Sequence, residues 1–429
     1  MRRGHGARAP LLVGLWRHPD FMKLWSAQTV SVFGSQVTTV ALALTAVLTL
    51  HATPLQVGLL RAVGAAPPLL IALFAGVWVD RLPRRPVLVW ADLGRAALLG
   101  SIPCAALLGV LGMEQLYIVV FLAGVLTTVF DVSHMSFVPA LVEPEQLVDG
   151  NSKLQTTFSL AYVLGPGLAG SLVALVTAPF AIAVDALSFL VSALVIGLIR
   201  VARVTPRAPA RRVRVRRDIG EGLRAVFGAP VLRALALYAG THNLFVSAIL
   251  SLLTLYAIRD LGLPPALIGV VLAAIGVGYL LGALIGRGVV RRWGLGPASV
   301  GGAVLNGMAV LLIPVASGHG IVPVALLVAS QLLLGLGIMV NDVPETSLRQ
   351  VLTPDRLRGR VNATIRFTSR GPSLFGALLG GALGQVVGLR VTLLAMGIGL
   401  LCAPLWLIFS PVPSLREPPS PVDGPAEAM

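Results

Sequence analysis

The stretches Gly124-Val-Leu-Thr-Thr-Val-Phe-Asp131-Val132 and Gly335-Leu-Gly-Ile-Met-Val-Asn-Asp342-Val343 decide the fold, because they are two copies of one pattern 211 positions apart. Each lies in an apolar run long enough to cross a lipid bilayer as a helix. Further matches occur at offsets of 211 or 210: Leu164–Leu172 with Phe375–Leu383, Glu143–Leu147 with Thr353–Leu357, and Val57-Gly58 with Ile268-Gly269. The chain therefore consists of two related halves.

The composition requires a lipid environment for these halves. Hydrophobic residues make up 56% of the 429 positions and charged residues 12%, and the mean hydropathy is +0.88. We predict an all-α integral membrane protein, since transmembrane β-strands would be shorter and would alternate in polarity. Twelve runs are candidate spans, six in each half: 24–49, 55–79, 86–110, 115–138, 155–177, 179–199, 231–257, 264–289, 297–316, 321–344, 363–386 and 388–410.

Basic residues orient these spans. Arginines concentrate in alternate loops, which by the positive-inside rule face the cytoplasm. This distribution predicts an N-in/C-in protein of a bacterial inner (cytoplasmic) membrane, and the net charge of +15 indicates topology rather than nucleic-acid binding. The expected organisation is an N-terminal six-helix bundle (1–199), a basic cytoplasmic linker with an amphipathic helix (200–230), a C-terminal bundle (231–410) and a disordered tail (411–429).

One predicted cytoplasmic loop, between the second and third spans, contains a functional motif. Gly76-Val-Trp-Val-Asp80-Arg81-Leu-Pro83-Arg84-Arg85 resembles the Gly-x-x-x-Asp-Arg-x-Gly-Arg-Arg motif of the major facilitator superfamily, with Pro83 in place of the second glycine. The resemblance implies a conformational latch made by Gly76, Asp80, Arg81, Arg84 and Arg85, in which the aspartate meets the N-terminus of the eleventh helix. The second half has no acidic residue in the corresponding segment Gly286–Gly294.

The fifth span carries a second motif, Gly165-Pro166-Gly167-x-x-Gly170. It resembles the Gly-Pro motif of exporters in the same superfamily, and its small residues allow close helix packing. Phe21–Gln28, Leu55–Gly58 and Gly359–Asn362 are similar to segments of the third drug:proton antiporter family, which includes macrolide-efflux-like and enterobactin-exporter-like proteins. The resemblance implies outward transport of amphiphilic or hydrophobic compounds, such as a drug or siderophore-like molecule, coupled to protons.

Ionisable residues at membrane depth are candidates for proton coupling or gating, because an unpaired charge in lipid is costly. The candidates are Asp131, Asp185, Asp342, Glu345, Arg366 and Arg370. Asp131 and Asp342 are related by the repeat and are expected to pair with Arg366, Arg370 or nearby basic groups, either as gates or as structural ion pairs. Asp92 and Arg95 either extend the loop network or serve as capping and snorkelling residues.

Polar residues of the first and seventh spans are candidates for a substrate cavity: Gln28, Ser31, Ser35, Gln36, His242, Asn243 and Ser247. Such sparse polarity suits a bulky amphiphile. Two other functions remain open: an uptake carrier for a small metabolite, and a membrane sensor or assembly factor that transports nothing. We expect no enzymatic activity, no cofactor and no metal site, because the sequence has no nucleotide loop, nucleophile motif or metal-ligand cluster. A monomer is expected.

Overall fold

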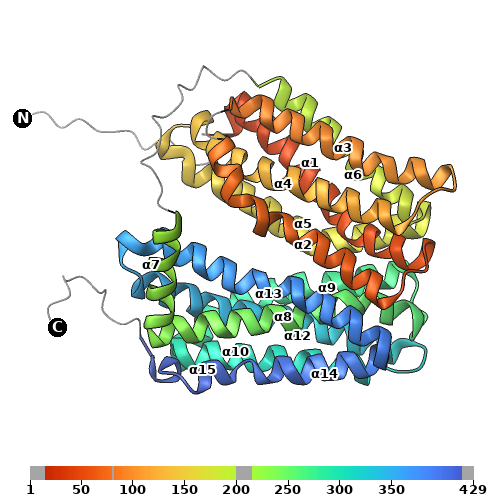
Figure 1. Cartoon of the computed structure of the whole chain (residues 1–429). Helices are drawn as coiled ribbons and strands as arrows, with labels where there is room; N and C mark the ends of the chain where they lie inside the picture. The colour runs from red at the N-terminus through yellow and green to blue at the C-terminus, as the bar shows by residue number, and fades with distance from the viewer. Residues whose placement is uncertain (1–14, 80–81, 200–214, 418–429) are drawn as a thin grey trace, which may run out of the picture.

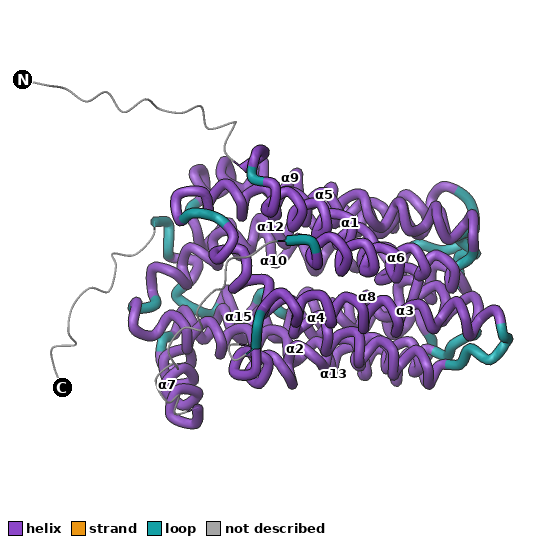
Figure 2. Tube along the Cα trace, turned by 90° about the horizontal axis from the view of Figure 1, so that it is seen from above, coloured by secondary structure: helices purple, strands orange, loops and turns teal. Residues whose placement is uncertain are grey.

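The computed structural model describes residues 15–79, 82–199 and 215–417, and every regular element in these residues is a helix. Long helices lie side by side, and short loops join them at the two ends of the molecule (Figure 2). The N-half contains α1 (Pro19–Leu44, extended by a π-helical turn Thr45–Thr49), α2 (Pro54–Val79), α3 (Arg84–Leu107), α4 (Met113–Leu141), α5 (Leu147–Val176) and α6 (Ala178–Gly197).

The C-half repeats this order. It contains α8 (Pro230–Arg259), α9 (Pro265–Trp293), α10 (Leu295–Val310) with α11 (Leu312–Val315), α12 (Ile321–Leu352), α13 (Arg358–Val387) and α14 (Leu389–Cys402) with α15 (Leu405–Ile408). Five of its six long helices begin 211 positions after their N-half counterparts, as Pro230 follows Pro19 and Pro265 follows Pro54. The fourth pair begins 208 positions apart but ends at Leu141 and Leu352, again 211 apart. The helix boundaries therefore confirm the repeat.

Within the described residues, eleven helices, rather than the twelve predicted, are long and apolar enough to cross a membrane. The predicted span 363–386 does form α13, but this helix is not among the eleven. It carries Arg358, Arg360, Arg366 and Arg370 in its first half, and these charges lower its hydropathy. Two other spans were predicted too short: α5 begins eight residues before position 155, and α12 ends eight residues after position 344. Hydropathy locates the apolar part of a helix, whereas backbone hydrogen bonding continues beyond it.

A short helix, α7 (Val215–Gly228), crosses one end of the C-half at a steep angle to the long helices (Figure 1). We call this end of the molecule the linker end, and the opposite end the far end. Val226 is fully buried in a cluster with Val361 and Ile365 of α13. Glu221 accepts hydrogen bonds from Arg217, at 2.9 Å, and from Arg360 of α13. Apolar and ionic contacts together fix α7 to the C-half.

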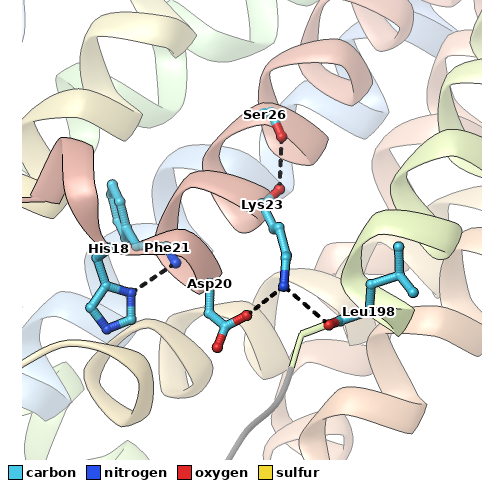
Figure 3. A network of polar contacts seen from close by, with 6 residues as sticks. All are labelled: His18, Asp20, Phe21, Lys23, Ser26 and Leu198. Atoms are coloured by element: carbon cyan, nitrogen blue, oxygen red, sulfur yellow. Dashed lines mark hydrogen bonds and ion pairs between the residues drawn. The ribbon is translucent and has the colours of Figure 1, made fainter.

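Polar contacts at the start of α1 explain part of the Phe21–Gln28 segment (Figure 3). The His18 Nδ1 atom accepts a hydrogen bond from the Phe21 backbone N–H at 3.1 Å, so His18 caps the helix. The Lys23 ammonium lies 2.8 Å from Asp20 and donates a hydrogen bond at 3.3 Å to the Leu198 carbonyl, just after α6. Lys23 therefore joins the first and last helices of the N-half.

The tail is ordered at its beginning, contrary to the prediction of disorder from position 411. Val412 is fully buried, and the backbone N–H of Gly296, at the start of α10, donates a hydrogen bond to the Leu415 carbonyl at 2.8 Å. A side chain at Gly296 would collide with the Val412 carbonyl, so glycine makes this docking possible. Residues 418–429 and linker residues 200–214 lie outside the described residues.

Candidate functional site

The exporter-type motif of α5 forms a contact between the two halves. A Cβ atom added to Gly170 would lie 2.6 Å from the Pro265 carbonyl oxygen and 2.7 Å from the Gly269 Cα atom, both on α9. One added to Gly269 would lie 2.7 Å from the Pro166 carbonyl oxygen. Only glycine allows such an approach of two backbones. Gly167 also faces α9, whereas Gly165 packs against Gln36 of α1, inside the N-half.

A second glycine crossing joins α2 to α13. A Cβ atom added to Gly58 would lie 2.5 Å from the Ala377 carbonyl oxygen and 2.9 Å from the Gly381 Cα atom. One added to Gly381 would lie 2.8 Å from the Pro54 carbonyl oxygen. Gly58 precedes Gly269 by 211 positions, and Gly170 precedes Gly381 by the same interval. The two crossings are therefore equivalent under the internal repeat.

Both crossings lie toward the far end, where helices of the two halves converge (Figure 1). The Arg259 guanidinium, at the end of α8, adds a polar contact there. It donates hydrogen bonds to the His51 and Ala52 carbonyl oxygens of the N-half, at 3.1 and 2.9 Å. The far end is thus closed by direct backbone contact between the halves.

A buried group of charges lies inside the N-half, among α3, α4 and α6. The Arg95 guanidinium is in ion-pair contact with Asp92, and its carbon lies 4.4 Å from the centre of the Phe130 ring and 4.1 Å from that of Phe189. Asp92 is 0% exposed and Arg95 4%. Both residues are buried within α3 and neither caps it, so the capping and snorkelling role is wrong. The loop-network role depends on Asp80 and Arg81, which lie outside the described residues.

Asp185 of α6 belongs to the same group and is 1% exposed. Its Oδ1 atom accepts a hydrogen bond from the Ser188 hydroxyl at 3.0 Å, and it interacts electrostatically with Asp92 and Arg95. A Cβ atom added to Gly34 of α1 would lie 2.5 Å from this Oδ1 atom and from the Ser188 Oγ atom. The α1 backbone thus covers Asp185 directly.

The repeat-related pair Asp131 and Asp342 is exposed in both halves. Glu345 is half-buried one turn after Asp342, and Arg349 interacts electrostatically with both carboxylates. Among the described residues no ion pair joins Asp131 or Asp342 to Arg366 or Arg370 of α13, and both arginines are exposed. The expected pairing is therefore not formed in this structure.

The predicted cavity residues divide into two groups. Gln28, Ser31 and Ser247 are at most 6% exposed and lie within helix packing, so they do not line open space. Asn243 donates a hydrogen bond at 2.8 Å to the Ala239 carbonyl of its own helix. His242 Nδ1 lies 3.4 Å from the Tyr238 hydroxyl. The residues that remain partly accessible are Ser35, Gln36, His242 and Asn243.

The predicted latch is described only in part. Asp80 and Arg81 lie outside the described residues, and Gly76 belongs to α2. Arg84, the first residue of α3, donates a hydrogen bond at 3.0 Å to the Ser136 carbonyl of α4, whereas Arg85 is exposed. Pro83 precedes α3 with φ −65°, an ordinary value, so glycine is not required at this position.

The sequence did not reveal the partners of the central residues. Gly58 and Gly269 match in the repeat, yet no sequence pattern indicates that Gly58 meets Gly381 or that Gly269 meets Gly170. Phe130 and Phe189 were indistinguishable from other apolar residues of their spans. The 211-residue offset, applied to every glycine, was the one signal that could have singled out both crossings.

Comparisons with known proteins agree with this architecture. Residues 9–424 match the family model described as transmembrane secretion effector. The multidrug efflux pump Tap of Mycolicibacterium fortuitum is 30% identical over 412 residues, which cover 94% of this chain and 97% of that protein. Macrolide efflux protein A of Streptococcus pyogenes is 24% identical over 226 residues, covering 53% of this chain and 55% of that protein.

Solved structures show the same fold. The crystal structure of a bacterial homologue of the iron transporter ferroportin in an inward-facing state matches with a TM-score of 0.74 at 20% identity, covering 93% of this chain and 99% of that one. These findings confirm the resemblance to the major facilitator superfamily. The chain belongs to the transmembrane secretion effector family of that superfamily and is a membrane transporter, not an enzyme.

Proposed function

We propose that this transporter moves amphiphilic or hydrophobic small molecules out of a bacterial cell by alternating access, in exchange for protons. One observation carries the proposal: the exporter-type motif of α5 forms the contact between the halves at the far end. The relatives named as multidrug and macrolide efflux proteins support outward transport of such compounds. A sugar or a charged metabolite has many polar groups that need hydrogen-bond partners. The few accessible polar residues, Ser35, Gln36, His242 and Asn243, would leave most of those groups without a partner.

In this proposal α13 is the twelfth membrane helix. It packs against α2 on one side and α8 on the other, so its arginines need not face lipid. The linker end, with α7, faces the cytoplasm, which gives the N-in/C-in arrangement expected from the loop arginines. The protein acts as a monomer in the inner membrane, because each chain contains both halves of the alternating-access unit.

The two ends of the molecule have opposite roles in the cycle. The glycine crossings close the far end in this structure, while Asp131, Asp342, Arg366 and Arg370 remain exposed. We assign the structure to a state open toward the cytoplasm. Transport then requires the far-end contacts to separate and the linker end to close. Gly76, Asp80, Arg81, Arg84 and Arg85 form the latch for that closure, and the bond from Arg84 to α4 anchors it.

Reconstituted vesicles provide the test. The purified protein is inserted into liposomes, a pH gradient is imposed, and the movement of ethidium and of a macrolide is followed together with the internal pH. We expect probe transport against its gradient, coupled to opposite proton movement, and a slower rate for Asp80→Asn with normal insertion. Transport in the same direction as protons would favour an uptake carrier. No gradient-dependent flux of any compound in a broad panel would contradict the proposal.

A further inference from the structure

We propose that Asp185 is a proton-binding site of this transporter, enclosed within the N-half and separate from the substrate cavity. The inference rests on the proposed function and adds to it the residue that exchanges the proton. It is carried by the buried group of Asp92, Arg95 and Asp185.

The first argument is charge balance. Asp92 and Asp185 are almost completely buried, and so is Arg95. If both carboxylates were ionised, this enclosed group would hold one surplus negative charge. An uncompensated buried charge is expensive, and a carboxylate in that position takes up a proton instead. One bound proton makes the group neutral.

The geometry assigns that proton to Asp185 rather than Asp92. Asp92 is in direct contact with the Arg95 guanidinium, which stabilises its ionised form. Asp185 instead accepts a hydrogen bond from the neutral hydroxyl of Ser188. The Arg95 guanidinium lies over the Phe130 and Phe189 rings, so two cation–π contacts restrain it from changing partner.

The neighbouring helices add few other charges. Asp92 and Arg95 of α3 act on Asp185 directly, and Asp131 of α4 acts on the same Arg95. His134 of α4 stacks on Phe130 with ring centres 5.9 Å apart. On the other side, α1 presents Gly34 and the Thr38 hydroxyl. The helix α5 has no charged residue after Lys153, and the turn Thr45–Thr49 has none.

Helix α1 connects this site with Gln36, one of the predicted cavity residues. Gly34 covers Asp185, and Gln36, two residues later, packs against Gly165 of the exporter-type motif. A movement of α1 relative to α6 would therefore open Asp185 and disturb the α1–α5 contact together. In the cycle, the closed arrangement holds the proton on Asp185, and displacement of α1 admits water and releases it.

The test compares two assays on the same liposomes: exchange of labelled ethidium without a pH gradient, and accumulation driven by a pH gradient. We expect Asp185→Asn to retain exchange but to lose gradient dependence, so that the ratio of flux with and without the gradient falls to one. It should also lose proton release on ethidium binding, measured with a pH-sensitive dye. The control Asp260→Asn, a carboxylate at the far-end surface, should behave as wild type.

Two further variants keep the test decisive. Ser188→Ala removes the hydrogen-bond donor but retains the carboxylate, so the pH profile of proton release should shift toward higher pH. This prediction can be checked even if Asp185→Asn fails to fold. Unchanged gradient-driven accumulation in Asp185→Asn, or an unchanged pH profile in Ser188→Ala, would overturn the inference. If the wild type itself showed no gradient-driven flux, the proposed function would fail instead.

Discussion

The two halves share a backbone plan but differ in the chemistry of their interiors. In the N-half, Asp92, Arg95 and Asp185 form a buried charged group. The positions 211 residues later hold Ala303, Asn306 and Met396, which are buried and uncharged. The difference shows that the fold does not need these charges, because the C-half packs the equivalent helices without them.

The same comparison applies where α1 and α8 cross their neighbours. In the N-half, Gly34 leaves room for the side chains of Asp185 and Ser188. In the C-half, the equivalent of Gly34 is Phe245, and its ring packs directly on Gly399, the equivalent of Ser188. In the N-half the glycine lies on α1 and the larger side chains lie on α6, whereas in the C-half the large side chain lies on α8 and the glycine lies on α14. Close packing is kept, but only the N-half has space for a carboxylate.

A third difference concerns the ion pair that α7 makes with the C-half. Glu221 of α7 meets Arg360 near the start of α13. The equivalent N-half residue is Asp149, which is paired with Lys153 at 2.6 Å. The position that offers a cation to Glu221 in the C-half therefore holds an acidic residue in the N-half.

The largest expected effect comes from removing Arg95, the one buried cation among the residues that the structure describes. Arg95→Met leaves the ionised Asp92 buried without its counter-charge, which should lower the free energy of unfolding by about 3–5 kcal/mol. Asn306→Ala, its C-half counterpart, should cost only about 1 kcal/mol, since one neutral polar group is lost. Thermal unfolding in detergent measures both. Equal losses in the two variants would show that the halves do not differ as described. The triple variant Arg95→Met, Asp92→Asn and Asp185→Asn has no buried charge left in this group and should recover most of the stability.

A smaller effect should appear equally in both halves, because the glycine crossings are equivalent. Gly58→Ala or Gly269→Ala places a Cβ atom within 2.7 Å of a facing backbone oxygen. Such overpacking costs about 1–3 kcal/mol, so the equilibrium constant for closure of the far end should fall about 5- to 150-fold. Spin labels at Leu108 and His319, equivalent exposed positions at the far end, would report longer distances. The control Gly301→Ala has no atom within 4 Å, and its distances should not change.

The smallest effect concerns α7. Hydrogen bonding to Arg217, followed by the field of Arg360, lowers the pKa of Glu221. At a pH above the usual pKa of a glutamate, Glu221 is therefore ionised and holds α7 in place. This contribution to stability is lost as the pH falls below about 4. A spin label at Leu223 should become more mobile in that range in the wild type. In Glu221→Gln it should be mobile at every pH, and Glu221→Arg with Arg360→Glu should restore the restraint. A label insensitive to both changes would remove the ionic explanation of docking.

The sequence predicted the helices well, for identifiable reasons. Apolar runs located every long helix, and prolines at helix starts such as Pro54 and Pro265 sharpened the boundaries because proline suits the first turn. It predicted the ends of α5 and α12 poorly, since those turns extend into polar sequence. The tail was predicted wrongly at Val412 because burial depended on Gly296, a residue more than 100 positions away.

The site was less predictable than the fold. Asp131, Asp185 and Asp342 were recognisable as charges in apolar runs, but their environments were not. Asp185 is enclosed, whereas Asp131 and Asp342 are exposed, and no local pattern separates these cases. For Asp92 and Arg95 the sequence left open a loop network or capping and snorkelling, and it gave no sign that packing buries both residues.

The sequence by itself determined that the chain is helical, hydrophobic and built of two related halves, because hydropathy and repeats depend on residue types along the chain. Only the tertiary structure decided which glycines meet across the halves and which charges share a buried space. Those pairings join positions far apart in sequence, such as Gly58 with Gly381. They depend on how each helix is rotated about its axis and how far it is shifted along it. The volume of a single side chain can alter both, and hydrophobic periodicity specifies neither.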